Sequence, residues 1–123
     1  MNIIDSSGWL EYFSDGPNAD YFIEPLRNTA ALIVPVITIY EVFKVVLRES
    51  TENDALQAVA AMQKGKVVDL NVRIAMKASK LSLLHNLPMA DSTILATAQE
   101  HKCVIWTQDA DFQNLENVKY FSK

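Results

Sequence analysis

The sequence predicts a three-layer α/β/α sandwich with a central, mostly parallel sheet, formed by a single domain over residues 1–123. Short apolar runs alternate with pairs of helical segments in the order β, α, α, β, α, α, β, α, α, β, β. Parallel strands need such helical crossovers. The 123 residues are enough for one sizeable core, and no low-complexity run or repeat marks a linker.

The chain begins with a strand and two short helices. Residues 2–5 are a short apolar run, and residues 8–13 carry apolar side chains at helical spacing. A turn follows by composition. Residues 20–28 form the second predicted helix, which Pro25 is expected to break or restart because proline lacks a backbone N–H.

The next unit contains a predicted capping motif. Residues 31–34 form an apolar strand, and Pro35 is expected to mark its end because proline cannot donate to a ladder. Residues 38–48 form a helix, with Thr38 as N-cap and Glu41 three residues later. This Thr-x-x-Glu pattern is a capping box.

A further helix, strand and helix follow in the middle of the chain. Residues 51–64 form a helix with Gly65 as its expected C-cap, and residues 67–70 form a short strand. Asn71 then caps a helix that runs to about residue 85. The apolar stripe of that helix is Ile74, Ala78, Leu81 and Leu84.

The last third of the chain contains an alanine-rich helix between two turns. Pro88 stands where a helix start tolerates proline. Residues 103–107 form a buried strand that runs into an acidic turn, and residues 118–121 alternate weakly, as in an edge strand. The single cysteine, Cys103, excludes an internal disulfide and is expected to be a small core residue.

Composition limits the classes of function. The net charge of −4 and the pI near 5.0 argue against a protein that binds nucleic acid by bulk attraction. They do not exclude acids that bind divalent cations. No apolar run approaches the roughly 18–20 residues of a membrane span, and the first residues lack the basic start of a signal peptide. We therefore expect a cytoplasmic protein with no membrane contact.

Four acids recur where strands end or helices begin: Asp5, Glu41, Asp91 and Asp109. If the strands are parallel, all four can meet at the carboxyl edge of the sheet, where α/β folds place their ligands. Two bare carboxylates about 4 Å apart repel by roughly 4 kcal/mol at an effective dielectric constant near 20. Gathering four is therefore costly unless cations lie between them.

Each acid also has a structural interpretation. Asp5 and Asp109 could cap a following helix, and Glu41 could serve only the capping box. Asp91 could stabilise a helix dipole by about 0.3–1 kcal/mol. Taken together, the four acids favour a site for Mg²⁺ or Mn²⁺, because hard oxygen ligands without a His or Cys cluster select these ions. The chemistry this predicts is metal-assisted phosphodiester hydrolysis.

Four ordered segments also carry a resemblance. They are IIDSSGWLEYF at the start, VITIYEV around Glu41, LPMADSTILATAQEHK around Asp91 and VIWTQDADF around Asp109. In this order, over nearly the full chain, they resemble a PIN-domain ribonuclease, specifically the VapC-type toxins of toxin–antitoxin pairs. The resemblance implies a Mg²⁺- or Mn²⁺-dependent endoribonuclease with a PIN-like fold. It also implies a structured RNA substrate such as tRNA or rRNA, a homodimer and a cognate VapB-type antitoxin.

The resemblance also implies roles for individual residues. Asp5, Asp91 and Asp109 would hold metal, and Glu41 would hold metal or water. Asp111 is a neighbouring candidate for the last acid. Ser6 and Thr107 resemble hydroxyls that orient the carboxylates or water. Many relatives have Thr-Asn after the first acid, where Ser6 and Ser7 stand here, so an amide contact expected from the family is missing.

Other residues allow two interpretations. Lys44 and Arg48 share a helical face with Glu41 and could bind RNA phosphates or the acids of an antitoxin, or could be a solvated face. His85 and His101 lack metal-ligand spacing and are expected at the surface. The aromatic residues of the first helix could form an antitoxin groove or core: Trp9, Tyr12 and Phe13. Trp106 is expected to pack on the sheet.

Two other functions remain open. One is a catalytically silent PIN-like module that acts only by binding an antitoxin or an operon partner. The other is a metal-dependent phosphatase or a receiver-like domain. A phosphatase of the haloacid dehalogenase type needs Asp-x-Asp after the first strand, and here Asp5 is followed by two serines. A receiver needs a pair of acids at that place, so Asp69 after the third strand would lack its partners.

Overall fold

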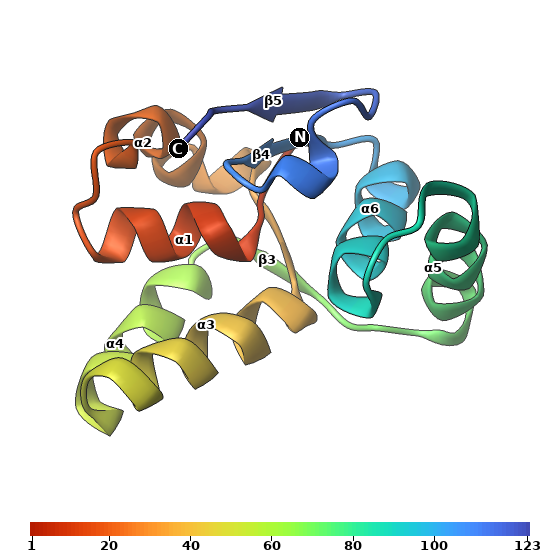
Figure 1. Cartoon of the computed structure of the whole chain (residues 1–123). Coiled ribbons are helices and arrows are strands. Elements are labelled where there is room, and N and C mark those ends of the chain that lie inside the picture. Colours follow the sequence, from red (N-terminus) through yellow and green to blue (C-terminus); the bar gives the residue numbers. More distant parts are fainter.

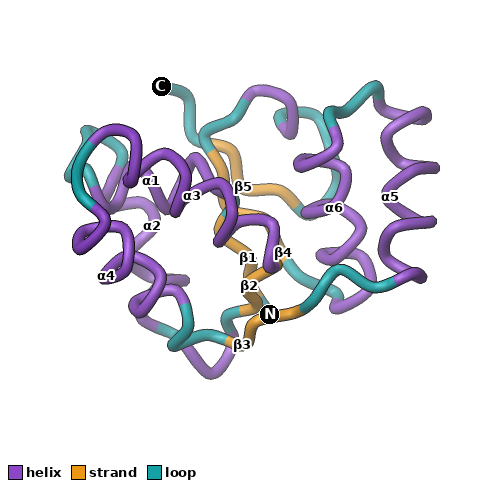
Figure 2. Tube along the Cα trace, turned by 90° about the horizontal axis from the view of Figure 1, so that it is seen from below, coloured by secondary structure: helices purple, strands orange, loops and turns teal.

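The computed structural model describes residues 1–123, and its five strands lie between two groups of helices (Figures 1 and 2). Every strand pair is parallel. The predicted α/β/α architecture and the predicted order of elements are confirmed. The strands are β1 (Asn2–Ile4), β2 (Ile33–Pro35), β3 (Lys66–Val68), β4 (Val104–Thr107) and β5 (Val118–Tyr120).

Six α-helices cover the two faces of the sheet. In Figure 2, α5 and α6 lie on one side of the strands and α1 to α4 on the other. Their bounds are α1 (Ser6–Phe13), α2 (Ala19–Arg27), α3 (Val36–Glu49), α4 (Glu52–Met62), α5 (Val72–His85) and α6 (Met89–His101). No helix is both long and apolar enough to cross a lipid bilayer.

Alternation along the strands divides the interior into two cores. Ile3 packs with the core beneath α5 and α6, whereas Ile4 packs with the core beneath α1 to α4. Ile105 and Trp106 divide in the same way on β4. Successive side chains of a strand point to opposite faces, so apolar runs of this kind are what a sheet covered on both sides requires.

The register of the sheet positions the acids. β1 pairs with β4, and β4 with β5, while β2 pairs with β3. A single bridge between Asn2 and Leu32 brings the two groups of strands together. Ile4 lies opposite Trp106, so the residues that follow β1 and β4 leave the same edge of the sheet together. We call this the carboxyl edge.

The capping box predicted for α3 is wrong. The helix begins at Val36, and Pro35 is its N-cap. Thr38 lies inside the first turn, where its hydroxyl donates a hydrogen bond of 2.7 Å to the carbonyl oxygen of Pro35. Pro35 still pairs in register with Val68, so the strand runs directly into the helix and leaves no residue for a separate cap. Glu41 is therefore free of any capping role.

Three smaller predictions also fail. The predicted break at Pro25 does not occur, because α2 continues to Arg27 with the proline ring buried inside it. Helix α4 ends at Met62, and its C-cap is Gln63 in a right-handed conformation rather than Gly65. Leu84 is 74% exposed. At about 100° per residue it is rotated roughly 80° from Ile74, away from the buried face.

Candidate active site

Asp5 is the most constrained acid of the carboxyl edge. It follows β1 as the N-cap of α1 and is 2% exposed. Its Oδ1 atom accepts hydrogen bonds from the Ser7 hydroxyl at 2.7 Å and from the Gly8 N–H at 3.1 Å. Its Oδ2 atom accepts from the Thr107 hydroxyl at 2.8 Å. Three donors therefore fix the plane of this carboxyl group.

Thr107 joins the ends of β1 and β4. Its Oγ1 atom, which donates to Asp5, accepts a hydrogen bond of 2.8 Å from the backbone N–H of Asp109. The Ser7 hydroxyl accepts in the same way from the N–H of Gln108 at 3.2 Å. One pair of hydroxyls thus positions acids from both strands. The contribution of Ser7 was not foreseen from the sequence, although a serine two residues after a strand-ending aspartate is a signal for it.

Three other carboxylates form the closest group. Asp91, Asp109 and Asp111 each offer an oxygen atom, and these atoms lie within 4.8 Å of one another. Asp91 lies in the first turn of α6. Asp109 caps a short 3-10 helix, Ala110–Phe112, and accepts a hydrogen bond of 2.9 Å from the Asp111 N–H. The predicted ligands Asp91 and Asp109 are thus brought together, with Asp111 in the group and Asp5 beside it.

Glu41 reaches the site through a hydroxyl rather than through another acid. The Ser6 hydroxyl donates a hydrogen bond of 2.5 Å to its Oε1 atom. This contact joins α3 to the first residue of α1, directly after Asp5. Glu41 is not one of the three carboxylates of the closest group.

Burial is the main cause of the raised pKa values of two acids in the site. Burial first, and then the hydrogen bond with Asp111 and the nearby charges of Asp109, Asp111 and Asp5, together raise the pKa of Asp91 to about 8. Burial raises the pKa of Asp5 to about 6, against the opposing effect of hydrogen bonds from Ser7, Thr107 and Gly8. Without a cation, the edge therefore holds a proton near neutral pH.

No basic side chain neutralises these acids. The two ion pairs of the chain are Arg48 with Glu49 and Arg73 with Glu100, both away from the acidic group. Carboxylates that share a proton and lack a basic partner fit a divalent cation, and an all-oxygen donor set fits Mg²⁺ or Mn²⁺. The donor chemistry of the site is therefore consistent with the predicted metal.

The other predicted binding residues lie elsewhere. Lys44 lies over the ring of Tyr40 at 5.7 Å, and Arg48 already pairs with Glu49 at 3.1 Å, so neither contacts the acids. Trp9 lies in the core and is 1% exposed. Tyr12 and Phe13 instead line a groove together with residues of α3 and α4.

Three expectations made from single residues have a clear outcome. Cys103 is buried, as expected, and burial raises the pKa of its thiol to about 11. Trp106 packs on the sheet. His85 is exposed, as expected, and lines a cavity, whereas His101 is only partly exposed.

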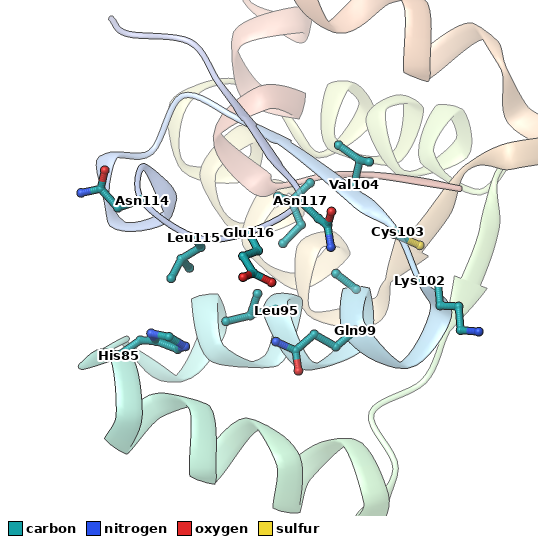
Figure 3. Close-up of a pocket in the computed structure, with 12 residues that line it drawn as sticks. His85, Leu95, Gln99, Lys102, Cys103, Val104, Asn114, Leu115, Glu116 and Asn117 are labelled. Atoms are coloured by element: carbon teal, nitrogen blue, oxygen red, sulfur yellow. The ribbon is translucent and has the colours of Figure 1, made fainter.

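The cavity that His85 lines lies at the other end of β4 (Figure 3). It has a volume of about 610 Å³ between α6, the start of β4 and residues 114–117. In Figure 3, Glu116 and Asn117 point toward α6 across this space. None of the carboxyl-edge acids lines it.

The comparison with known protein families identifies the fold family. A family model described as "PIN domain" matches residues 3–118, almost the whole chain. The chain belongs to the PIN-domain family. Among curated proteins, none is similar enough in sequence to be a significant match.

Solved structures share this fold over nearly the whole of this chain. A chain of a toxin–antitoxin complex from Klebsiella pneumoniae is 22% identical with a TM-score of 0.85, and each chain is covered to 100%. VapC20 of Mycobacterium tuberculosis, a toxin that cleaves the sarcin–ricin loop, is 13% identical with a TM-score of 0.80 over 94% of this chain and 95% of that one. A chain of DNA-bound VapBC from Salmonella typhimurium is 14% identical with a TM-score of 0.75, over 99% of this chain and 98% of that one.

Proposed function

We propose that this PIN domain is a metal-dependent endoribonuclease and the toxin of a toxin–antitoxin pair. The observation that carries the proposal is the group of carboxylates at the carboxyl edge, which has raised pKa values and no basic partner. Such a group is costly to the fold, and a bound cation offsets that cost. The similar toxin–antitoxin structures support the class of activity.

The site residues have distinct proposed roles. Asp91 and Asp109, with Asp5, hold Mg²⁺ or Mn²⁺, and Asp111 supplements Asp109. A bound ion of this kind would lower the pKa of a water molecule and stabilise the leaving oxygen of a phosphodiester. Glu41 would orient the attacking water, and the Ser6 hydroxyl holds the Glu41 carboxylate in place.

The remaining hydroxyls keep the acids in position. Ser7 and Thr107 fix the Asp5 carboxylate, and Thr107 also holds the backbone of Asp109. Site groups whose own positions are fixed need little reorganisation during the reaction. No side chain of the edge has to act as a covalent nucleophile in this scheme.

The proposed substrate is a structured RNA, either tRNA or rRNA. VapC20, which shares the fold, cleaves the sarcin–ricin loop. A net charge of −4 means that RNA is bound through local contacts and metal ions rather than through bulk attraction. The proposed location is the cytoplasm, where such RNA is found.

The proposed partner is a VapB-type antitoxin, and the groove between α1, α3 and α4 fits one of its helices. The groove has a volume of about 850 Å³. Its walls are mainly apolar, and Glu49 and Asp54 lie among its lining residues. An amphipathic helix with basic residues beside its apolar face would suit both properties. The apolar lining residues are Leu10, Tyr12, Phe13, Val45, Val46, Ala58 and Ala61.

A homodimer is also proposed. Helix α5 exposes apolar side chains that the monomer leaves uncovered: Val72 is 76% exposed, Met76 62% and Leu83 88%. Val72, Met76 and Leu83 are four and seven residues apart, so they lie on one face of the helix. Exposed apolar faces of this kind mark interaction surfaces.

Cleavage of RNA by the purified protein tests the proposal. The expected result is cleavage of bulk tRNA or rRNA with Mg²⁺ or Mn²⁺, which stops with EDTA and is absent in a folded Asp91→Asn variant. The alternative is a silent PIN-like module that only binds its partner. Cleavage that is absent in the wild type, or that survives both EDTA and the substitution, would favour the module.

A further inference from the structure

A small hollow adjoins the acidic group on the side of β5. It has a volume of about 460 Å³, within the roughly 300–1,000 Å³ of small-ligand sites. Asp109 is the one residue that belongs both to this hollow and to the closest group of carboxylates. The hollow therefore continues the site along the carboxyl edge. Its lining residues are Ser7, Gln108, Asp109, Ala110, Tyr120, Ser122 and Lys123.

The far wall of the hollow is held in place. After β5 the chain returns toward α1 and α2 (Figure 1). The Phe121 ring stacks on Tyr21 at 4.5 Å and meets Phe22 edge-on at 5.5 Å. These contacts fix the residue that lies between Tyr120 and Ser122. The wall is thus part of the packed domain, although its side chains are partly exposed.

Asn18 ties this wall to the end of β4. Its amide nitrogen donates to Gln108 Oε1 at 3.0 Å and to the carbonyl oxygen of Ser122 at 3.1 Å. The Gln108 side-chain oxygen is thus paired, while its side-chain nitrogen has no hydrogen-bond partner within the protein and can donate to a ligand. Ser7 and Gln108 are themselves joined by a hydrogen bond. The hollow is therefore preorganised, which lowers the cost of binding.

The chemistry of the lining matches one unpaired nucleotide. Tyr120 offers an aromatic face, and Lys123 offers the one positive charge of the hollow. Proteins that bind unpaired RNA combine these two features, with an aromatic ring under the base and a cation at the phosphate. Beside a cluster of carboxylates, a lysine also reduces the repulsion that a phosphate would meet.

We propose that this hollow binds the RNA nucleotide next to the scissile phosphate, with its base on Tyr120 and its phosphate beside Lys123. The inference rests on the proposed nuclease function. Tyr120 and Lys123 are then substrate-binding residues, and they determine which unpaired position of an RNA reaches the metal site.

Single-turnover cleavage of bulk bacterial tRNA and rRNA, with protein in excess, tests this assignment. The half-saturating protein concentration reports RNA binding, and the limiting rate reports the chemical step. Base stacking on an aromatic ring contributes about 1–3 kcal/mol, so Tyr120→Leu should raise the half-saturating concentration about 5- to 140-fold. The limiting rate and the Mn²⁺ affinity should stay close to the wild-type values. Tyr120→Phe, which keeps the ring, should behave like the wild type.

Two further variants test the contribution of the lysine charge and control for general effects of replacing an aromatic side chain. Lys123→Gln should weaken binding and reduce the slope of log affinity against log salt by about 0.7–1. Tyr40→Leu, which removes an exposed aromatic ring from α3, is the matched control and should change nothing. Thermal melts establish that each variant is folded.

The outcomes distinguish the two proposals. A wild type that cleaves RNA, together with a folded Tyr120→Leu variant of unchanged half-saturation, would overturn the nucleotide site alone. So would equal losses in Tyr120→Phe and Tyr120→Leu. A wild type that cleaves no RNA with either metal would instead remove the nuclease function on which the site depends.

Discussion

The two ends of β4 differ in the side chains that gather around them. At the carboxyl edge, Asp5 and Asp91 have pKa values raised to about 6 and about 8, and the hydroxyls of Ser7 and Thr107 hold the acids in place. At the opposite end, a cavity of about 610 Å³ has a mixed lining in which Glu116 is the one acid. This cavity is larger than the hollow beside the acids, yet no group of like-charged side chains lines it.

This difference indicates that a group of gathered carboxylates, rather than a large cavity, marks the functional site in this fold. A cavity can form wherever a loop passes over a helix, without any gathering of like charges. Gathered carboxylates destabilise the fold, and such strain persists only where the surrounding structure enforces it. The carboxyl edge is enforced by hydrogen bonds from Thr107 of β4 and from Ser7 and Gly8 of α1, so we propose that function resides there rather than in the cavity.

The largest expected effect comes from removing one charge at each end of β4. Asp5→Asn should lower RNA cleavage by at least about 100-fold, because even the outer partners of metal ligands contribute 10- to 100-fold. Glu116→Gln, its matched control in the cavity, should leave cleavage within about twofold of the wild type. Cleavage rates of both variants, with melts to confirm folding, provide the measurement. Equal losses in the two variants would contradict the distinction between the two ends.

A smaller effect is expected from a single hydroxyl. Thr107→Val keeps the shape of the side chain but removes the donor to Asp5 and the acceptor for the Asp109 N–H. The Mn²⁺ affinity, measured by calorimetry, should fall about 10- to 100-fold.

Thr97→Val is the matched control for this substitution. It removes an equally buried hydroxyl, which donates to the Thr93 carbonyl at 2.8 Å. It should cost up to about 1 kcal/mol of stability without changing the Mn²⁺ affinity. A loss of affinity in the control as large as in Thr107→Val would mean that the effect is general destabilisation.

The smallest effect concerns the pH dependence of stability without metal. Asp5 and Asp91 bind protons more tightly in the folded state than in the unfolded state, where an aspartate has a pKa near 3.8. The free energy of unfolding should therefore fall as the pH rises from about 4 to about 8. The Asp5 shift of roughly two units corresponds to about 3 kcal/mol at most. Asp91 acts in the same direction, and its effect is weakened by solvent screening.

Denaturant melts in EDTA across this pH range provide the measurement. Excess Mg²⁺ should restore the stability at the alkaline end, because the cation replaces the shared proton. Asp91→Asn should flatten the curve and remove the effect of Mg²⁺. A metal-free wild type that gains stability with rising pH would show that the acids are not gathered as described.

Local patterns were sufficient to predict the order of the elements. The short apolar run at residues 31–34 correctly indicated a buried strand, although β2 itself is Ile33–Pro35. Asn71 begins α5 as a side-chain cap, as predicted. The capping box predicted at Thr38 and Glu41 does not form, because the pairing of Pro35 with Val68 fixes where helix α3 starts. Tertiary structure overrides a local capping signal in this case.

The acids could be predicted to meet, and the resemblance pointed to Ser6 and Thr107 as hydroxyls near them, but which hydroxyl pairs with which acid could not be predicted. The parallel register of Ile4 with Trp106 decides that Thr107 faces Asp5, and no local pattern encodes a register between residues so distant in sequence. The tight turn after Asp109 likewise brings Asp111 into the closest group. The roles of all these acids remain predictions.

Calorimetric titration of Mn²⁺ into the wild type and into Asp91→Asn tests the central claim most directly. We predict binding to the wild type with release of a proton near neutral pH, since the pKa of Asp91 is about 8 without metal. We predict no binding to the variant, which should melt at least as high as the metal-free wild type because the folded state no longer has to keep a carboxyl group protonated at this position. A wild type that binds no Mn²⁺, or a folded Asp91→Asn variant that binds it equally well, would contradict the assignment of this edge as a metal centre.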